Sequence, residues 1–150
     1  MERLVDDLEA IDPFSPNALC AVDNALWDIA GKAYGVPVYK LLGGLARRRI
    51  GIARSLPVAD PGVMAERAVA LKEQGYKLLT VKTGFDDRTD LRRLAAVRQA
   101  VGPDFPVEID PNEAYNRETA FKLLRQMEQY DLTSIEQPVP AWDLRTMAEL

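Results

Sequence analysis

The sequence predicts an α/β fold, in which a helical segment precedes the first four βα units of a TIM-like (β/α) barrel. From about residue 50, a short apolar run and a helical stretch alternate four times, with strands starting near residues 50, 78, 107 and 134. Alternation at this spacing is typical of parallel βαβ units. The strands also alternate apolar and polar residues, whereas strands covered by helices on both faces are continuously apolar. A barrel with a polar interior therefore fits better than an open doubly wound sheet.

Residues 1–49 are predicted to form helices without strands. Asn17 is expected to cap a helix rich in apolar residues, and Gly31 is expected to interrupt it. Gly35, followed closely by a proline, is expected to end the helix. This segment is therefore predicted to be a helical subdomain, distinct from the barrel units that follow it.

Three residues of this subdomain are expected to be buried. Phe14 and Trp27 are bulky aromatic residues, which proteins usually bury. Cys20 is the single cysteine of the chain, so it cannot form an intrachain disulfide, and it lies among alanine, leucine and valine. We therefore expect Cys20 to be a core residue.

The four barrel units each begin with a predicted strand, at residues 50–53, 78–81, 107–110 and 134–136. The predicted helices follow from Asp60 to Gln74, from near Asp90, after Asn116, and after Pro140 to Leu150. Residues 50–150 therefore form the second predicted domain.

Polar residues share one face of three of these strands: Thr80 with Lys82, Glu108 with Asp110, and Ser134 with Glu136. Barrels of this kind carry their chemistry at the carboxyl ends of the strands. Lys82, Asp110 and Glu136 occupy those ends, so they are the candidate functional residues. Taken alone, each of them is better explained as a solvated strand-end or turn charge, but their occurrence at successive strand ends favours a functional role.

Composition excludes several kinds of active site. The chain of 150 residues contains no histidine, which excludes Ser-His-Asp and Cys-His nucleophiles and histidine zinc sites within it. Neither GxxxxGK[ST] nor GxGxxG occurs, so the phosphate-binding loops with those motifs are absent too. Catalysis by these residues is therefore expected to depend on carboxylates, lysines and a hard metal ion.

Charge and hydropathy argue against two classes of partner. The net charge of −4 is spread along the chain, so we expect no nucleic-acid partner. There is no apolar run of membrane-spanning length, so we expect no membrane partner. The first residues lack the basic and apolar regions of a signal peptide, and we therefore expect a cytoplasmic location.

An ordered set of motifs resembles the enolase superfamily, and more closely its mandelate racemase/muconate lactonizing enzyme group. The motifs are ALWDIAGK at 25–32, GVPVY at 35–39, LLGG at 41–44, GYK at 75–77, VKTG at 81–84, VEIDPN at 107–112 and IEQP at 135–138. The resemblance implies that residues 1–49 are the C-terminal helical part of an α+β capping domain with its linker. Residues 50–150 are then the N-terminal half of the barrel.

The resemblance also implies a reaction. Members abstract a proton next to a carboxylate, and Mg²⁺ stabilises the enediolate that results. By position, Lys82 matches a catalytic acid/base, Asp110 and Glu136 match metal ligands, and Asn112 supports the first ligand. The implied function is that of a racemase, cycloisomerase or dehydratase acting on a small-molecule carboxylate substrate. The full-length protein is expected to be a homo-oligomer.

The sequence departs from the family pattern in three places. Thr80 replaces the first lysine of a Lys-x-Lys pair, which removes a cation that would favour the neutral form of Lys82 or hold a substrate carboxylate. Residues 111–113 read Pro-Asn-Glu where Ala-Asn-Gln is more usual. The third metal ligand and second acid/base are expected beyond Leu150, so we expect the chain to be a fragment. The alternatives are a non-catalytic truncated fragment and a half-barrel that pairs with a second copy, because an open four-stranded sheet leaves unpaired edges.

Overall fold

The computed structural model describes residues 2–13 and 15–150. The chain divides into two compact units, Met1–Ile50 and Gly51–Leu150. Phe14, which we expected to be buried, lies outside the described residues. Across the described ranges, every helix is too short or too polar to cross a membrane.

The first unit contains three helices: α1 (Glu2–Ile11), α2 (Pro16–Tyr34) and α3 (Val38–Leu41). The expected cap at Asn17 is wrong, because Ser15 is the N-cap residue of α2 and Pro16 occupies its first turn. Proline is favoured there, since its φ angle is already helical and its missing N–H has no partner to lose. Asn17 is consequently inside the helix.

The course and end of α2 show how two glycines differ. Gly31 does not interrupt the helix as expected; it is buried, and a Cβ atom there would come within 3.0 Å of the Val36 carbonyl oxygen. Its role is to let the following loop approach the helix. Gly35 does end the helix, in a left-handed conformation with φ 65°, which confirms that prediction.

Cys20 and Trp27 are less buried than expected. The face of α2 that packs near α1 carries Ala18, Leu19 and Val22, at helical spacing. Cys20 lies off this stripe and is exposed, so the expectation of a core cysteine is wrong. Trp27 is half-buried within the described chain.

The second unit is built on a parallel sheet of three strands in the order β1 (Ala53–Leu56), β2 (Leu78–Lys82) and β3 (Val107–Asp110). The first strand begins three residues later than predicted. The predicted fourth strand is reduced to an isolated parallel bridge between Ile109 and Ile135. It ends there because Gln137 turns into a left-handed conformation with φ 38°, and Pro138 has no N–H for the ladder.

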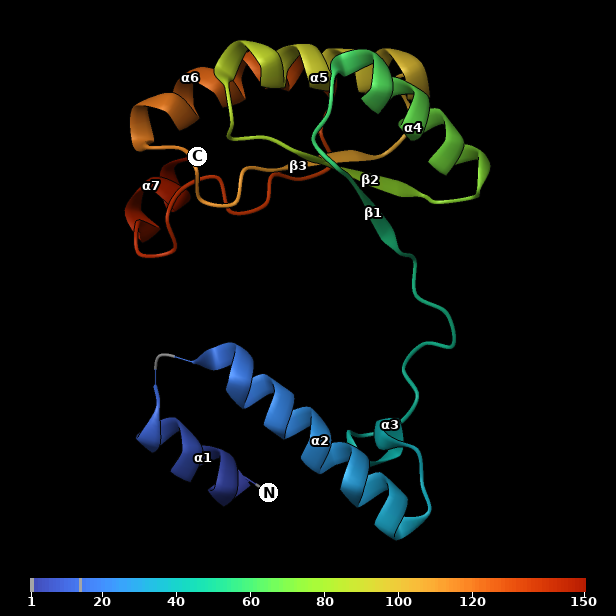
Figure 1. Ribbon diagram of the computed structural model, residues 1–150, viewed down its shortest axis with the longest axis vertical. Coiled ribbons are helices and arrows are strands. Elements are labelled where there is room, and N and C mark those ends of the chain that lie inside the picture. The colour runs from blue at the N-terminus through green and yellow to red at the C-terminus, as the bar shows by residue number, and fades with distance from the viewer. Residues whose placement is uncertain (1, 14) are drawn as a thin grey trace. The chain divides into compact units, whose positions relative to one another are not determined.

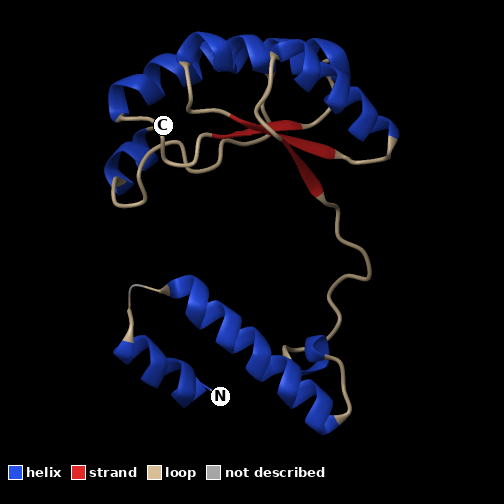
Figure 2. Ribbon diagram, viewed as in Figure 1, coloured by secondary structure: helices blue, strands red, loops and turns tan. Residues whose placement is uncertain are grey.

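Helices α4 (Pro61–Glu73), α5 (Asp87–Val101) and α6 (Arg117–Met127) lie on one face of this sheet (Figure 1). They are followed by the 3₁₀ turn η1 (Glu128–Tyr130) and the short helix α7 (Leu144–Glu149), and Figure 2 shows the alternation of strand and helix along the chain. Helix α5 begins three residues before Asp90, because the Asp86 side chain caps it by accepting a hydrogen bond from the Thr89 N–H.

The core of this unit lies between the sheet and the helices. Its strand residues are the apolar members of the alternating pattern, and its helix residues come from the inner faces of α4, α5 and α6. The completely buried examples include Leu56, Leu79, Val81, Val107, Ile109, Met64, Leu94, Val97 and Leu123. The polar members of the strands therefore occupy the face opposite the helices, as the alternation predicted.

Candidate functional site

The strand register places the predicted site residues at one edge of the sheet. Lys82 and Asp110 are direct partners in the parallel pairing of β2 with β3. Glu136 directly follows Ile135, whose bridge partner Ile109 directly precedes Asp110. All three residues therefore lie where their strands or bridge segment finish.

Lys82 and Asp110 form an ion pair between the ends of β2 and β3. The Lys82 Nζ atom donates to Asp110 Oδ2, and it also donates to Asn112 Oδ1 at 2.9 Å. The Asp110 side chain is 4% exposed, whereas that of Lys82 is 31% exposed. The carboxylate is thus held inside the site, and the amine remains accessible from one side.

Asn112 fixes the orientation of the Asp110 carboxylate. Its backbone N–H donates to Asp110 Oδ1 at 2.9 Å, and its side-chain amide donates to Oδ2 at 3.1 Å. This arrangement requires Asn112 to adopt a left-handed conformation with φ 49°, which asparagine tolerates better than most residues. Both oxygens of Asp110 are consequently engaged.

A second polar layer lies two residues earlier along the strands than this pair. The Thr80 hydroxyl donates to Glu108 Oε1 at 2.6 Å, and the Ser134 hydroxyl donates to Glu108 Oε2 at 2.8 Å. Thr80 is buried. Thr80 therefore contributes to a hydroxyl–carboxylate network with Glu108 and does not contact the Lys82 amine.

Glu136 is the predicted site residue that the structure does not join to the others. Its side chain is exposed and has no hydrogen-bond or ion-pair partner among the described residues. Its backbone N–H donates to the Ile109 carbonyl at 2.9 Å, so the main chain is held in place. The position of this carboxylate thus depends on the backbone of its own segment.

The site offers oxygen atoms, which are the type of ligand that a hard cation prefers. Asp110 and Glu136 supply carboxylate oxygens at neighbouring strand ends, and Mg²⁺ often takes one or two protein carboxylates together with substrate oxygens and water. Within residues 2–13 and 15–150, however, no group of three or more Asp, Glu, His or Cys side chains is placed to hold a metal ion. The described residues therefore offer part of a coordination shell.

The role of Asp90 in holding the loop after β2 was not predicted from the sequence, which indicated only that a helix starts near this residue. The side chain is completely buried, and its Oδ2 atom accepts hydrogen bonds from the N–H groups of Gly84, Phe85 and Asp86, at 2.7, 3.0 and 3.3 Å. Its other oxygen pairs with Arg93 at 3.0 Å. Asp90 therefore shapes the loop that follows β2. The sequence did contain a signal for this role, because a loop with a glycine, residues 84–86, lies four to six residues before the Asp90 carboxylate.

Gly84 lets this loop pack against the loop that follows β3. It has φ 96°, and a Cβ atom there would lie 2.5 Å from the Ala114 Cβ and 2.8 Å from the Pro111 carbonyl oxygen. The backbone N–H of Thr83 also donates to the Asp110 carbonyl at 3.2 Å. The loops that follow Lys82 and Asp110 are thus in direct contact.

Tyr115 anchors the same region from inside. Its ring is buried, and its backbone N–H donates to the Pro138 carbonyl at 3.0 Å. Burial raises the pKa of Tyr115 to about 12, so it is a neutral phenol under ordinary conditions. It supports the strand ends as a packing residue and not as a charge.

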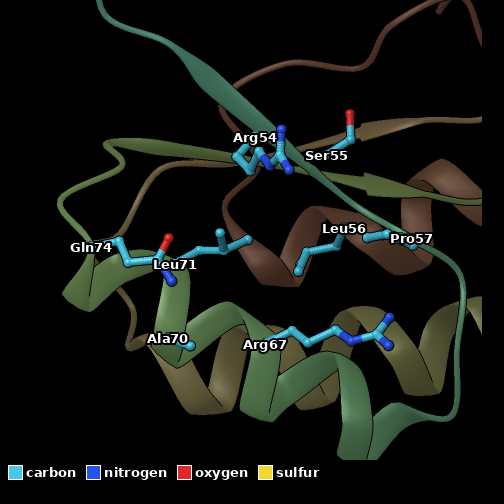
Figure 3. Close-up of a pocket in the computed structure, with 8 residues that line it drawn as sticks. All are labelled: Arg54, Ser55, Leu56, Pro57, Arg67, Ala70, Leu71 and Gln74. Carbon is cyan, nitrogen blue, oxygen red and sulfur yellow. The ribbon is translucent and has the colours of Figure 1, made fainter.

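A separate hollow of about 450 Å³ lies between β1 and α4 (Figure 3). It is lined by Arg54, Ser55, Leu56, Pro57, Arg67, Ala70, Leu71 and Gln74. It contains no carboxylate and no lysine, and none of the residues that the sequence singled out. We therefore do not assign the chemistry of the strand ends to this hollow.

Comparison with known proteins identifies the two parts of the chain. Residues 63–150 match the family described as "Enolase C-terminal domain-like", and residues 8–43 match the "Mandelate racemase / muconate lactonizing enzyme, N-terminal domain". An N-succinyl-L-Arg/Lys racemase from Bacillus cereus is 36% identical over 151 residues, covering 100% of this chain and 41% of that protein. A hydrophobic dipeptide epimerase from Enterococcus faecalis is 33% identical over 144 residues, covering 96% of this chain and 40% of that protein.

Solved structures agree with these matches. The crystal structure of a mandelate racemase/muconate lactonizing family protein from an Azoarcus species is similar with a TM-score of 0.92 and 39% identity, over 99% of this chain and 40% of that one. The chain thus spans about 40% of the length of the curated relatives it matches. Its α/β fold corresponds to part of their barrel. The chain belongs to the mandelate racemase/muconate lactonizing enzyme family of the enolase superfamily.

Proposed function

We propose that this protein abstracts a proton next to the carboxylate of a small-molecule substrate, with Mg²⁺ as its cofactor. The observation that carries the proposal is the pairing of Lys82 with Asp110 at the ends of adjacent parallel strands. The relatives support the reaction class, because they are named as racemases, epimerases, cycloisomerases and dehydratases. These reactions share proton transfer at a carbon next to a carboxyl group.

Lys82 is the proposed acid/base. Its amine is partly exposed while Asp110 and Asn112 hold it from one side, so it is oriented and still reachable by a substrate. In its neutral form the Nζ atom accepts the substrate proton, and in its protonated form it returns a proton to the same carbon. Positioning of this kind supplies a large share of catalysis.

Asp110 and Glu136 are the proposed ligands of the cofactor, and Asn112 is proposed to orient the first of them. When bound, Mg²⁺ stabilises the negative charge that develops on the carboxylate oxygens of the substrate. The chain's own contribution is to present two oxygen donors at neighbouring strand ends. Orientation of a ligand by a hydrogen-bonded neighbour, as at Asn112, is typical of metal sites.

Thr80 distinguishes this site from a two-lysine arrangement. Its hydroxyl is committed to Glu108, so position 80 supplies no cation for a substrate carboxylate. We propose that Thr80 supports the strand ends through this network, and that Lys82 with the metal site binds the carboxylate end of the substrate.

Proton exchange with solvent tests the proposal directly. The protein is incubated with Mg²⁺ in D₂O with N-succinyl amino acids and with dipeptides, and loss of the α-proton signal is followed by NMR. Lys82→Ala is expected to slow the exchange by about 10²-fold or more, the usual contribution of a general base. Lys77→Ala is the matched control, because Lys77 is exposed just before β2, at the opposite end of that strand.

The outcomes separate the catalytic and non-catalytic interpretations. Exchange that requires Lys82 but not Lys77 supports the proposal. Exchange that is equal in the wild type and in Lys82→Ala contradicts the role of Lys82. If no substrate exchanges and Mg²⁺ does not bind, the proposal fails for this chain, and the non-catalytic packing partner becomes the better interpretation.

A further inference from the structure

We infer that Glu113 is a positioning residue that holds the segment carrying Glu136 against the segment carrying Asp110. The inference rests on the proposed function, in which these two carboxylates hold the metal ion. Glu113 is also the residue at which the sequence departs from the more usual glutamine of its family. Either side chain offers an oxygen that can accept a hydrogen bond, so the inference concerns this oxygen and not the charge of Glu113.

Glu113 binds the neighbouring segment twice. Its backbone N–H donates to the Gln137 carbonyl at 2.8 Å, directly after Glu136. Its Oε1 atom accepts a hydrogen bond from the Ala141 N–H at 3.2 Å, further along the same segment. A single residue thus contacts both ends of the turn that follows Glu136.

These contacts matter because Glu136 has no side-chain partner of its own among the described residues. Its position relative to Asp110 is set by the main chain. Before Glu136, the main chain is held by the bridge between Ile109 and Ile135. After Glu136, it is held by the bonds to Glu113 and by the bond from the Tyr115 N–H to the Pro138 carbonyl.

The backbone of this region favours glycine, yet it carries side chains. Glu113 has φ 66° and Gln137 has φ 38°, in the left-handed region that residues with a Cβ atom rarely adopt. Such conformations persist only where surrounding contacts enforce them. The carboxylate of Glu113 provides one of those contacts, and a glycine at this position would keep the backbone conformation while losing it.

Variants of Glu113 can therefore separate the loss of its side-chain contact from a change in its backbone conformation. Glu113→Gly removes the carboxylate and suits the left-handed backbone. Glu113→Gln keeps a side-chain oxygen that can accept the Ala141 hydrogen bond, without the negative charge. Glu128→Ala is the control, because Glu128 is an exposed acid at the end of α6 whose side chain has no partner among the described residues.

Mg²⁺ alone is titrated into each variant by calorimetry, and the amide exchange of Ala141 is measured by NMR. Glu113→Gly is expected to weaken Mg²⁺ binding by about 10-fold, as loss of an outer positioning contact typically does, and to speed the Ala141 amide exchange. Glu113→Gln is expected to keep both the Mg²⁺ affinity and the Ala141 amide exchange rate of the wild type. Glu128→Ala is expected to change neither.

Each outcome decides between the two proposals. If the wild type binds Mg²⁺ and Glu113→Gly binds it equally well, the inference is wrong and the proposed function stands. The inference also fails if Glu113→Gly loses Mg²⁺ affinity only in proportion to a loss of stability in urea. If the wild type binds no Mg²⁺, the proposed metal site fails, and the role of Glu113 fails with it.

Discussion

The two ends of the parallel sheet turn the chain by different means. Before the strands, the residues with positive φ are Gly75, Gly102 and Asp131, and nothing lies within 4 Å of where the Cβ atoms of the two glycines would be. After the strands, the residues with positive φ are Gly84, Asn112, Glu113 and Gln137. Glycine is the residue that adopts this conformation without strain. Residues with a Cβ atom therefore adopt this conformation more often after the strands than before them, at an energetic cost.

Helix α5 also differs between the two ends of the sheet. It carries one buried charge near each of its own ends, and the two charges have opposite signs. Arg98, in its last turn, donates to a set of backbone carbonyls at the starts of the strands: Gly102, Pro103, Phe105, Tyr130 and Asp131. Asp90, in its first turns, accepts from three backbone N–H groups where β2 ends. Each charge has the sign that the helix dipole favours at its end.

The largest effect is expected from Arg98→Ala, which tests the strand-start end. The substitution removes a buried guanidinium together with its hydrogen bonds to several partly buried carbonyls, so we expect the free energy of unfolding to fall by about 3 kcal/mol. Arg92→Ala is the control, because Arg92 is exposed on the same helix. Urea unfolding measures both variants. If Arg98→Ala lowered the free energy of unfolding no more than Arg92→Ala does, the proposed role of Arg98 at the strand-start end would be contradicted.

An intermediate effect is expected from Gly84→Ala, and Gly75→Ala is its matched control. The two glycines have φ 96° and φ 93°, so both substitutions carry the same conformational cost. Only at Gly84 does the new Cβ atom collide with another loop. We expect Gly84→Ala to lose about 2 kcal/mol more than Gly75→Ala in urea unfolding, the usual cost of overpacking. Equal losses would show that the contact between the loops relaxes freely.

The smallest effect is expected at acidic pH, from Asp86 at the start of α5. Hydrogen bonds from the side chain and backbone of Thr89 lower the pKa of Asp86. The unfolded chain therefore takes up this proton at higher pH than the folded chain. The stabilisation is complete above the ordinary aspartate pKa of about 4 and is lost as the pH falls through the lower folded value.

Asp86→Asn retains a capping side chain but cannot titrate, so stability should fall less steeply below about pH 4 than in the wild type. Urea unfolding across the acidic range measures the slope. Asp104→Asn is the control at the strand-start end, where Asp104 is exposed and its side chain has no partner among the described residues. An identical slope in Asp86→Asn and the wild type would contradict the assignment of the cap.

Much of this arrangement could be predicted from the sequence, because the two-residue period of a strand is a strong constraint. It placed Thr80 and Lys82 on one face, and Glu108 and Asp110 on the matching face of the next strand. Parallel pairing then brings Lys82 beside Asp110. Their catalytic and metal-binding roles remain predictions that the exchange and titration experiments test.

The parts that could not be predicted depend on the path of loops. The sequence pattern predicted a helix from near Asp90, and only the folded loop shows that Asp86 caps this helix while Asp90 turns inward to the backbone of residues 84–86. The fourth strand was predicted from a short apolar run, but Gln137 and Pro138 limit it to one bridge. Both differences follow from local backbone geometry, which residue periodicity does not specify.

The register of the sheet also bears on how the chain folds while it is being synthesised. Each strand pairs with the next strand along the chain: β1 with β2, β2 with β3, and β3 with the segment at Ile135. Among the described residues, each strand pairs with the strand of the adjacent βα unit, so this part of the sheet can grow by one unit at a time as the ribosome releases it. Each new pairing therefore closes a loop of a single βα unit, which costs less entropy than pairing with a more distant strand would.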